Sequence, residues 1–136
     1  MNLSEAIEQL RELNEPVPKP MRLPTEQEVA AAEQRLGITL HPDFRRYLIE
    51  ASDVVFGALE PATVIDESSH TNLISICESA WEMGVPRELT PICEDNADYY
   101  CIDNQGRIRF WSHNGTTDES WKNLATWIEE VWIGEN

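Results

Sequence analysis

The chain has 136 residues, of which 41% are hydrophobic, and this length and composition are typical of one globular domain. Its 25 acidic residues outnumber its 10 lysines and arginines, which gives a net charge of −15 at pH 7. A field of this sign repels nucleic acids and anionic membranes and attracts basic proteins, so we expect no nucleic-acid or membrane partner.

The N-terminal segment lacks the pattern of a secretion signal. Residues 1–13 contain three glutamates, where a signal peptide needs a basic start and an apolar run. The three cysteines are odd in number and have no close pairing, which favours reduced thiols. We interpret the chain as cytoplasmic.

The first two segments predict a helix and an arm. Apolar residues recur at helical spacing from Leu3 to Leu13, and four prolines follow within residues 15–24. Proline fixes φ and removes a backbone donor, so this stretch is expected to be an extended connector. We divide the chain into an N-terminal helix with a proline-rich arm, residues 1–24, and a single domain over residues 23–134.

Two well-signalled helices come next. Thr25 and Glu28 have the spacing of a capping box, and Gly37 can adopt the left-handed conformation that ends a helix. Pro42 starts the third helix, with His41 as its N-cap. Beyond it, residues 54–65 contain clusters of β-forming residues and predict one or two short strands.

A fourth helix is inserted before the main strands. Asn72 can cap it and Gly84 can end it. Residues 98–103 and 107–112 then predict two antiparallel strands, joined by a turn in which Gly106 supplies a positive φ.

The C-terminal segment predicts one further helix, from Trp121 to Trp132, with Thr117 or Asp118 as its cap. The element order indicates an α+β fold. We expect a central antiparallel sheet, a meander, with N-terminal helices, one inserted helix and a C-terminal helix packed against it.

No motif for chemistry emerges from the residues. Histidines and cysteines show no metal-ligand spacing, and no glycine-rich loop could hold a phosphate, so we expect no metal and no cofactor. The acidic turns fail the calcium-loop pattern. Cys101, Ser112, His113 and Asp103 are nucleophile, base and orienting candidates without an accompanying motif, and we interpret the chain as not an enzyme.

The tryptophans divide into core and surface candidates. We assign Trp81, Trp121 and Trp132 to the core because they lie at helical spacing with other apolar residues. Trp127 lies off the face defined by Trp121 and is the candidate interface anchor, since tryptophan concentrates binding energy at interfaces.

Four stretches in order resemble one known group of proteins. They are the helix entry Leu40-His41-Pro42-Asp43-Phe44-Arg45-Arg46-Tyr47-Leu48, the strand Asp98–Asp103, the strand Gly106–His113 and the helix Ser120–Ile128. Together they are similar to the Smi/Knr branch of the SUKH superfamily. That branch often has a glycine-rich turn before the second stretch, where this chain has Asp95-Asn96-Ala97.

The resemblance implies an α+β domain that acts by binding proteins. Bacterial members are immunity proteins that neutralise a cognate toxin, and eukaryotic relatives act in cell-wall regulation. It implies no catalytic residues. We expect the chain to act as a monomer or weak homodimer.

If the partner is a basic toxin, such as a nuclease, an acidic surface would speed its association. We assign this contact surface to Glu94, Asp95, Asp98 and Asp103, with Trp127 as an anchor. The alternatives are a regulatory scaffold with a housekeeping partner and an uncharacterised hydrolase that uses Cys101 or His113.

Overall fold

The structure is a computed structural model, and it describes residues 1–65 and 68–135. Four helices precede a four-stranded antiparallel sheet of order β1-β2-β3-β4. The elements are α1 (Leu3–Leu13), α2 (Glu26–Leu36), α3 (Pro42–Ala51), α4 (Leu73–Met83), β1 (Thr90–Asp95), β2 (Asp98–Ile102), β3 (Ile108–Ser112), β4 (Gly115–Trp121), α5 (Leu124–Trp127) and the π-helix η1 (Ile128–Ile133). The predicted α+β meander is confirmed.

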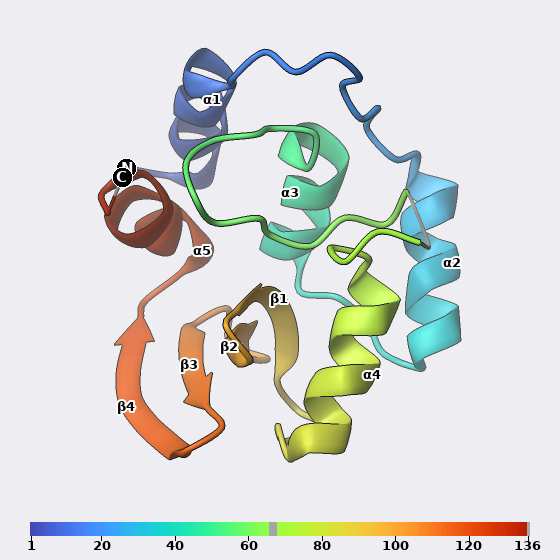
Figure 1. The fold of residues 1–136 in the computed structure, drawn as a ribbon, viewed down its shortest axis with the longest axis vertical. Helices are drawn as coiled ribbons and strands as arrows, with labels where there is room; N and C mark the ends of the chain where they lie inside the picture. Colours follow the sequence, from blue (N-terminus) through green and yellow to red (C-terminus); the bar gives the residue numbers. More distant parts are fainter. Residues whose placement is uncertain (66–67, 136) are drawn as a thin grey trace.

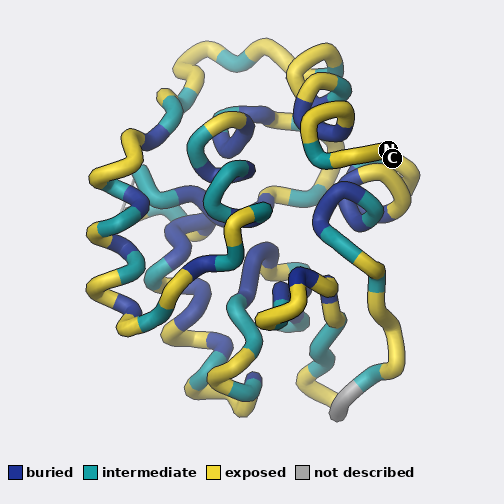
Figure 2. The backbone as a smooth tube through the Cα atoms, turned by 180° about the vertical axis from the view of Figure 1, so that it is seen from behind, coloured by how far each residue is buried: buried dark blue, intermediate teal, exposed yellow. Residues whose placement is uncertain are grey.

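The helices surround the sheet on more than one side. Figure 1 shows α1, α3 and α5 above the sheet, with α4 beside β1. The buried residues of all these elements form one hydrophobic cluster, which includes Ala6, Ile7 and Leu10 of α1. Figure 2 shows the same inward-facing turns as the buried parts of the backbone. The N-terminal helix therefore shares the core of the domain that follows it.

The predicted caps of α2 and α3 are confirmed, because each depends only on nearby residues. Thr25 Oγ1 accepts a hydrogen bond from the Glu28 N–H at 3.2 Å, and Glu28 Oε1 accepts one from the Thr25 N–H at 2.9 Å. Gly37 ends α2 with φ of 70°. The His41 Nδ1 atom accepts a hydrogen bond from the Asp43 N–H at 3.1 Å at the start of α3.

Residues 54–65 do not form the predicted strands. Only isolated bridges occur there, from Pro61 to Cys93 and from Thr63 to Asn72, and the Ala62 N–H donates to the Ile92 carbonyl at 2.8 Å. Proline has no N–H to give to a ladder. The segment consequently crosses the edge of β1 without extending the sheet.

The C-terminal prediction is wrong in its first part. Strand β4 occupies Gly115–Trp121 and pairs with β3, so neither Thr117 nor Asp118 caps a helix. The cap is Asn123, whose Oδ1 accepts from the Thr126 N–H at 2.8 Å. The alternating apolar pattern that identifies a strand is missing here, since residues 118–120 are exposed and polar.

The turn between β1 and β2 carries backbone strain. Asp95 pairs with Asp98, and the two residues between them, Asn96 and Ala97, have φ of 53° and 71°. Such hairpin turns favour glycine or asparagine at both positions. Asn96 satisfies this preference, and Ala97 does not.

We expect Ala97→Gly to stabilise the protein. A left-handed residue with a Cβ costs roughly 1–2 kcal/mol, and the added freedom of glycine in the unfolded chain costs about 0.4–1 kcal/mol. The net gain should be about 0.5–1 kcal/mol in urea unfolding. The matched control is Ala31→Gly, on an exposed position of α2, which should lose about 1 kcal/mol; equal losses in both variants would contradict the strained turn.

Candidate functional site

The sheet separates the four predicted contact acids into two groups. Glu94, Asp95 and Asp98 meet at the β1–β2 turn, whereas Asp103 follows the far end of β2. Five residues of strand span about 16 Å at roughly 3.3 Å per residue. The structure thus brings three of the four acids together.

Asp98 holds two turns of the sheet in place. Its Oδ1 atom accepts a hydrogen bond from the His113 N–H at 3.1 Å and lies 2.7 Å from the His113 Nδ1 atom. Burial opposes ionisation of this carboxyl, and the hydrogen bonds from the backbone and ring of His113 outweigh that effect and hold its pKa below the usual value. The Asp98 carboxylate therefore has a structural role, because it links the β1–β2 turn to the β3–β4 turn.

Asp103 stabilises the β2–β3 turn in a similar way. Its Oδ1 atom accepts hydrogen bonds from the N–H groups of Gln105 and Arg107, both at 2.9 Å. Its Oδ2 atom lies 3.7 Å from Arg107 Nε and 3.8 Å from Arg109 Nη1. These contacts fix the turn that the sequence predicts around Gly106, where φ is 85°.

Glycine at position 106 also joins this turn to α3. A Cβ atom at Gly106 would lie 2.7 Å from the His41 Nε2 atom, which is closer than non-bonded heavy atoms approach. The side chain that caps α3 therefore packs directly on the hairpin backbone.

Glu94 and Asp95 lie beside another pair of ionisable residues, which the sequence did not single out. Glu60 and His70 face them across an opening of about 160 Å³, and we call these four residues the acidic corner. His70 Nε2 lies 2.6 Å from Glu60 Oε2. The hydrogen bond to Glu60 and its negative charge raise the pKa of His70.

We expect Glu60→Gln to lower the pKa of His70, measured by NMR titration of the imidazole ring. The raised pKa contributes stability at low pH, and this contribution is lost as the pH rises through the folded-state value. Because the His70 and Glu60 side chains are 74% and 63% exposed, the change in unfolding free energy should be small. Glu94→Gln, which removes only a more distant charge, should move the pKa less; no change in either variant would contradict the contact.

Trp127 is not a surface anchor. It is 1% exposed, with its ring centroid 5.2 Å from that of Tyr100 and 6.4 Å from that of Trp132. The prediction measured its position from Trp121, which lies in β4 and not in the helix. Counted from Leu124, the first residue of α5, Trp127 lies three residues on and belongs to the buried face.

The three cysteines are poorly placed for nucleophilic catalysis. All three cysteines are buried, and burial raises the pKa of Cys93 and Cys101 to about 12 and also raises that of Cys77. A thiol attacks as the thiolate, so these groups are unreactive at neutral pH. Across residues 1–65 and 68–135, no group of three or more histidine, cysteine or acidic side chains could hold a metal ion.

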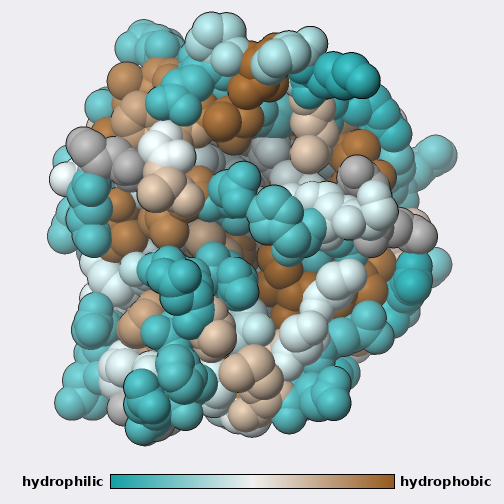
Figure 3. Space-filling view, in the orientation of Figure 1, coloured by the Kyte–Doolittle hydropathy of each residue, from teal (hydrophilic) through white to brown (hydrophobic). Residues whose placement is uncertain are grey.

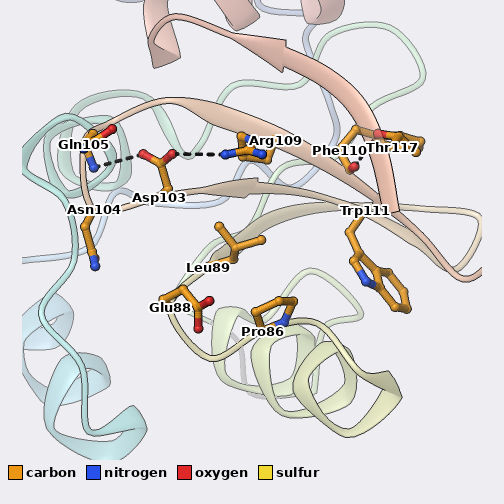
Figure 4. Close-up of a pocket in the computed structure, with 10 residues that line it drawn as sticks. All are labelled: Pro86, Glu88, Leu89, Asp103, Asn104, Gln105, Arg109, Phe110, Trp111 and Thr117. Atoms are coloured by element: carbon orange, nitrogen blue, oxygen red, sulfur yellow. Dashed lines mark hydrogen bonds and ion pairs between the residues drawn. The ribbon is translucent and has the colours of Figure 1, made fainter. Parts of the chain in front are cut away.

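A hollow between β3 and the loop that follows α4 is a feature that the sequence did not predict. It has a volume of about 410 Å³, and we call it the sheet hollow. Its walls are the α4–β1 loop, the β2–β3 turn and the face of β3 that carries Arg109 and Trp111 (Figure 4). The lining residues are Pro86, Glu88, Leu89, Asp103, Asn104, Gln105, Arg109, Phe110, Trp111 and Thr117.

Part of this hollow could have been predicted from the sequence. Its strand pattern places Arg109 and Trp111 on one face, and a tryptophan beside an exposed arginine is a common feature of binding surfaces. What the sequence could not show is that the loop after α4 stands away from that face.

Comparison with known proteins decides the family. Residues 3–133 match SUKH_5, described as SMI1-KNR4 cell-wall. The chain belongs to this family. A crystal structure of a protein from Pseudomonas syringae pv. tomato is similar, with 48% sequence identity and a TM-score of 0.92 over 96% of this chain and 98% of that chain.

None of the curated proteins matches the chain. The SUKH family is generally non-catalytic, which agrees with the protonated, buried thiols. No helix within the described part of the chain is long and apolar enough to cross a membrane.

Proposed function

We propose that this SUKH protein is a cytoplasmic immunity protein that binds and neutralises a cognate toxin with a basic surface, such as a nuclease. The observation that supports this most directly is the way its own charges are used. Among the residues that the structure describes, at least six of its ten lysines and arginines form ion pairs with carboxylates of the same chain: Arg11, Arg22, Arg45, Arg46, Arg107 and Arg109. Most of the positive charge is therefore paired with carboxylates within the chain.

Exposed carboxylates remain available to bind a partner. Exposed carboxylates lie on α4, on β4, on η1 and in the acidic corner, and Figure 3 shows hydrophilic side chains over much of one face, with apolar groups between them. Several of these carboxylates form no ion pair with another described residue, among them Glu78, Glu82, Glu94, Asp118, Glu129 and Glu130.

Such a surface favours rapid capture of a basic protein. Complementary potentials steer diffusional encounter and raise association rates well above those of neutral surfaces. An immunity protein gains from a high association rate because the toxin must be bound before it acts. No chemical step is needed, since occupying the active surface of the toxin is enough.

The second candidate is a regulatory scaffold. The family description refers to the cell wall, and the same acidic surface would suit a basic housekeeping partner. The two functions differ in whether the partner is toxic by itself.

Co-expression separates the two candidates. The partner to use is the product of a gene adjacent to that of this chain, expressed from an inducible promoter in bacteria. We expect arrested growth with the partner alone and restored growth when this chain is co-expressed. A partner that binds this chain and does not affect growth would favour the scaffold, and toxicity that persists despite expression of the folded chain would contradict immunity.

The acidic corner has its own test. Glu94→Gln with Asp95→Asn removes two charges from it and leaves the structural roles of Asp98 and Asp103 intact. We expect the association rate with the partner to fall roughly twofold to fivefold at low salt, with a flatter salt dependence. The control is Glu8→Gln with Glu12→Gln, on the exposed face of α1; equal effects of the two pairs would exclude the acidic corner as the contact.

A further inference from the structure

The sheet hollow has an apolar part and an acidic part. Pro86, Leu89 and Trp111 provide apolar walls, and the carboxylates of Glu88 and Asp103 lie to one side of them (Figure 4). A long side chain with a charged end would match both parts at once, because its methylene groups can lie along apolar surface while its head stays polar.

The two carboxylates retain capacity to accept hydrogen bonds. Glu88 is exposed and makes no ion pair or hydrogen bond with the other described residues. Asp103 Oδ1 is used by two backbone N–H groups, but Oδ2 has only the two arginines at 3.7 and 3.8 Å, which is beyond hydrogen-bonding distance. Arg109 opposes a cation here, so Glu88 is the stronger of the two anchors.

The C-terminus of α4 adds negative potential to the same place. Gly84 ends this helix, and a Cβ atom at Gly84 would lie 3.7 Å from the ring of Trp111. The last carbonyl groups of a helix carry the negative end of its dipole. The apolar end of the hollow thus also favours a cation.

The neighbouring loop already shows the corresponding contact within the chain. The Arg87 guanidinium carbon lies 4.0 Å from the centroid of the Trp81 ring, which is a cation–π interaction. Trp111 is the next partly exposed indole on this side of the sheet and is not covered in this way among the described residues.

We propose that the sheet hollow binds an arginine or lysine side chain of the protein partner, with its aliphatic stem against Leu89 and Trp111 and its charged head on Glu88. The proposal rests on the proposed function, since it identifies where the basic partner makes contact. A second copy of this chain is a poor occupant because each copy carries a charge of −15. A purely apolar guest would strip water from Glu88 and Asp103 without replacing its hydrogen bonds.

The test is an NMR titration of the whole ¹⁵N-labelled protein with the peptide acetyl-Gly-Arg-Gly-amide. The matched probe contains citrulline, which is a neutral analogue of arginine. We expect the arginine peptide to shift the Trp111 indole N–H and the backbone amides of Leu89 and Gln105 in a saturable way, with smaller shifts at the acidic corner. The citrulline peptide should produce a much weaker effect.

Two variants make the result decisive. Glu88→Gln, at an exposed loop position, should weaken binding of the arginine peptide about threefold to fivefold, as expected for an exposed ion pair. Glu8→Gln removes the same charge from α1 and should change it by less than about 1.5-fold, because distant charges are screened at 0.15 M salt. Trp111→Phe keeps an aromatic wall and should bind less tightly than the wild type, since indole is the better cation–π partner.

Three outcomes would overturn the proposal. These are equal shifts with the citrulline peptide, shifts spread evenly over the acidic surface, and equal effects of Glu88→Gln and Glu8→Gln. The titration contains no toxin, so such a result would exclude the sheet hollow and leave the growth-rescue experiment to decide the proposed function. Conversely, saturable binding at the hollow without growth rescue would contradict immunity alone.

Discussion

The packing of Trp127 and Trp132 in the C-terminal helical segment is the contact on which the two parts of the fold depend. Trp127 lies against Tyr100 of β2, and Trp132 lies edge-on to Tyr47 of α3, with ring centroids 6.0 Å apart. The Trp132 Nε1 atom also donates to the Phe56 carbonyl at 2.9 Å. One short segment therefore holds the sheet, α3 and the loop that follows α3.

This packing makes two opposite contributions to the free energy of unfolding, and they differ in size. The Trp127 Nε1 atom is buried and has no hydrogen-bond partner among the residues that the structure describes, which disfavours the folded state by about 1–3 kcal/mol. Loss of a buried tryptophan ring costs about 3–5 kcal/mol. The apolar contact outweighs the unsatisfied N–H, and this explains why a tryptophan is tolerated where its polar atom is left alone.

Local signals predicted much of the fold and little of the site. A capping box, a left-handed glycine and the β2–β3 turn depend on residues a few positions apart, so the sequence alone indicated them. Strand β4 was not predicted because its exposed polar residues do not alternate with apolar ones. Its pairing with β3 depends on tertiary contacts that the sequence does not show. The acids were identified, but whether a carboxylate holds a turn, as Asp98 does, or remains open to a partner, as Glu94 does, depends on contacts between distant segments.

The burial of all three thiols also has a practical consequence. Cys77, Cys93 and Cys101 are shielded from solvent, and each is held in its unreactive protonated form. A fluorophore or spin label attached through one newly introduced surface cysteine should therefore react at that position alone, with the native cysteines left unchanged. Distances between this protein and whatever it binds become measurable without a cysteine-free variant.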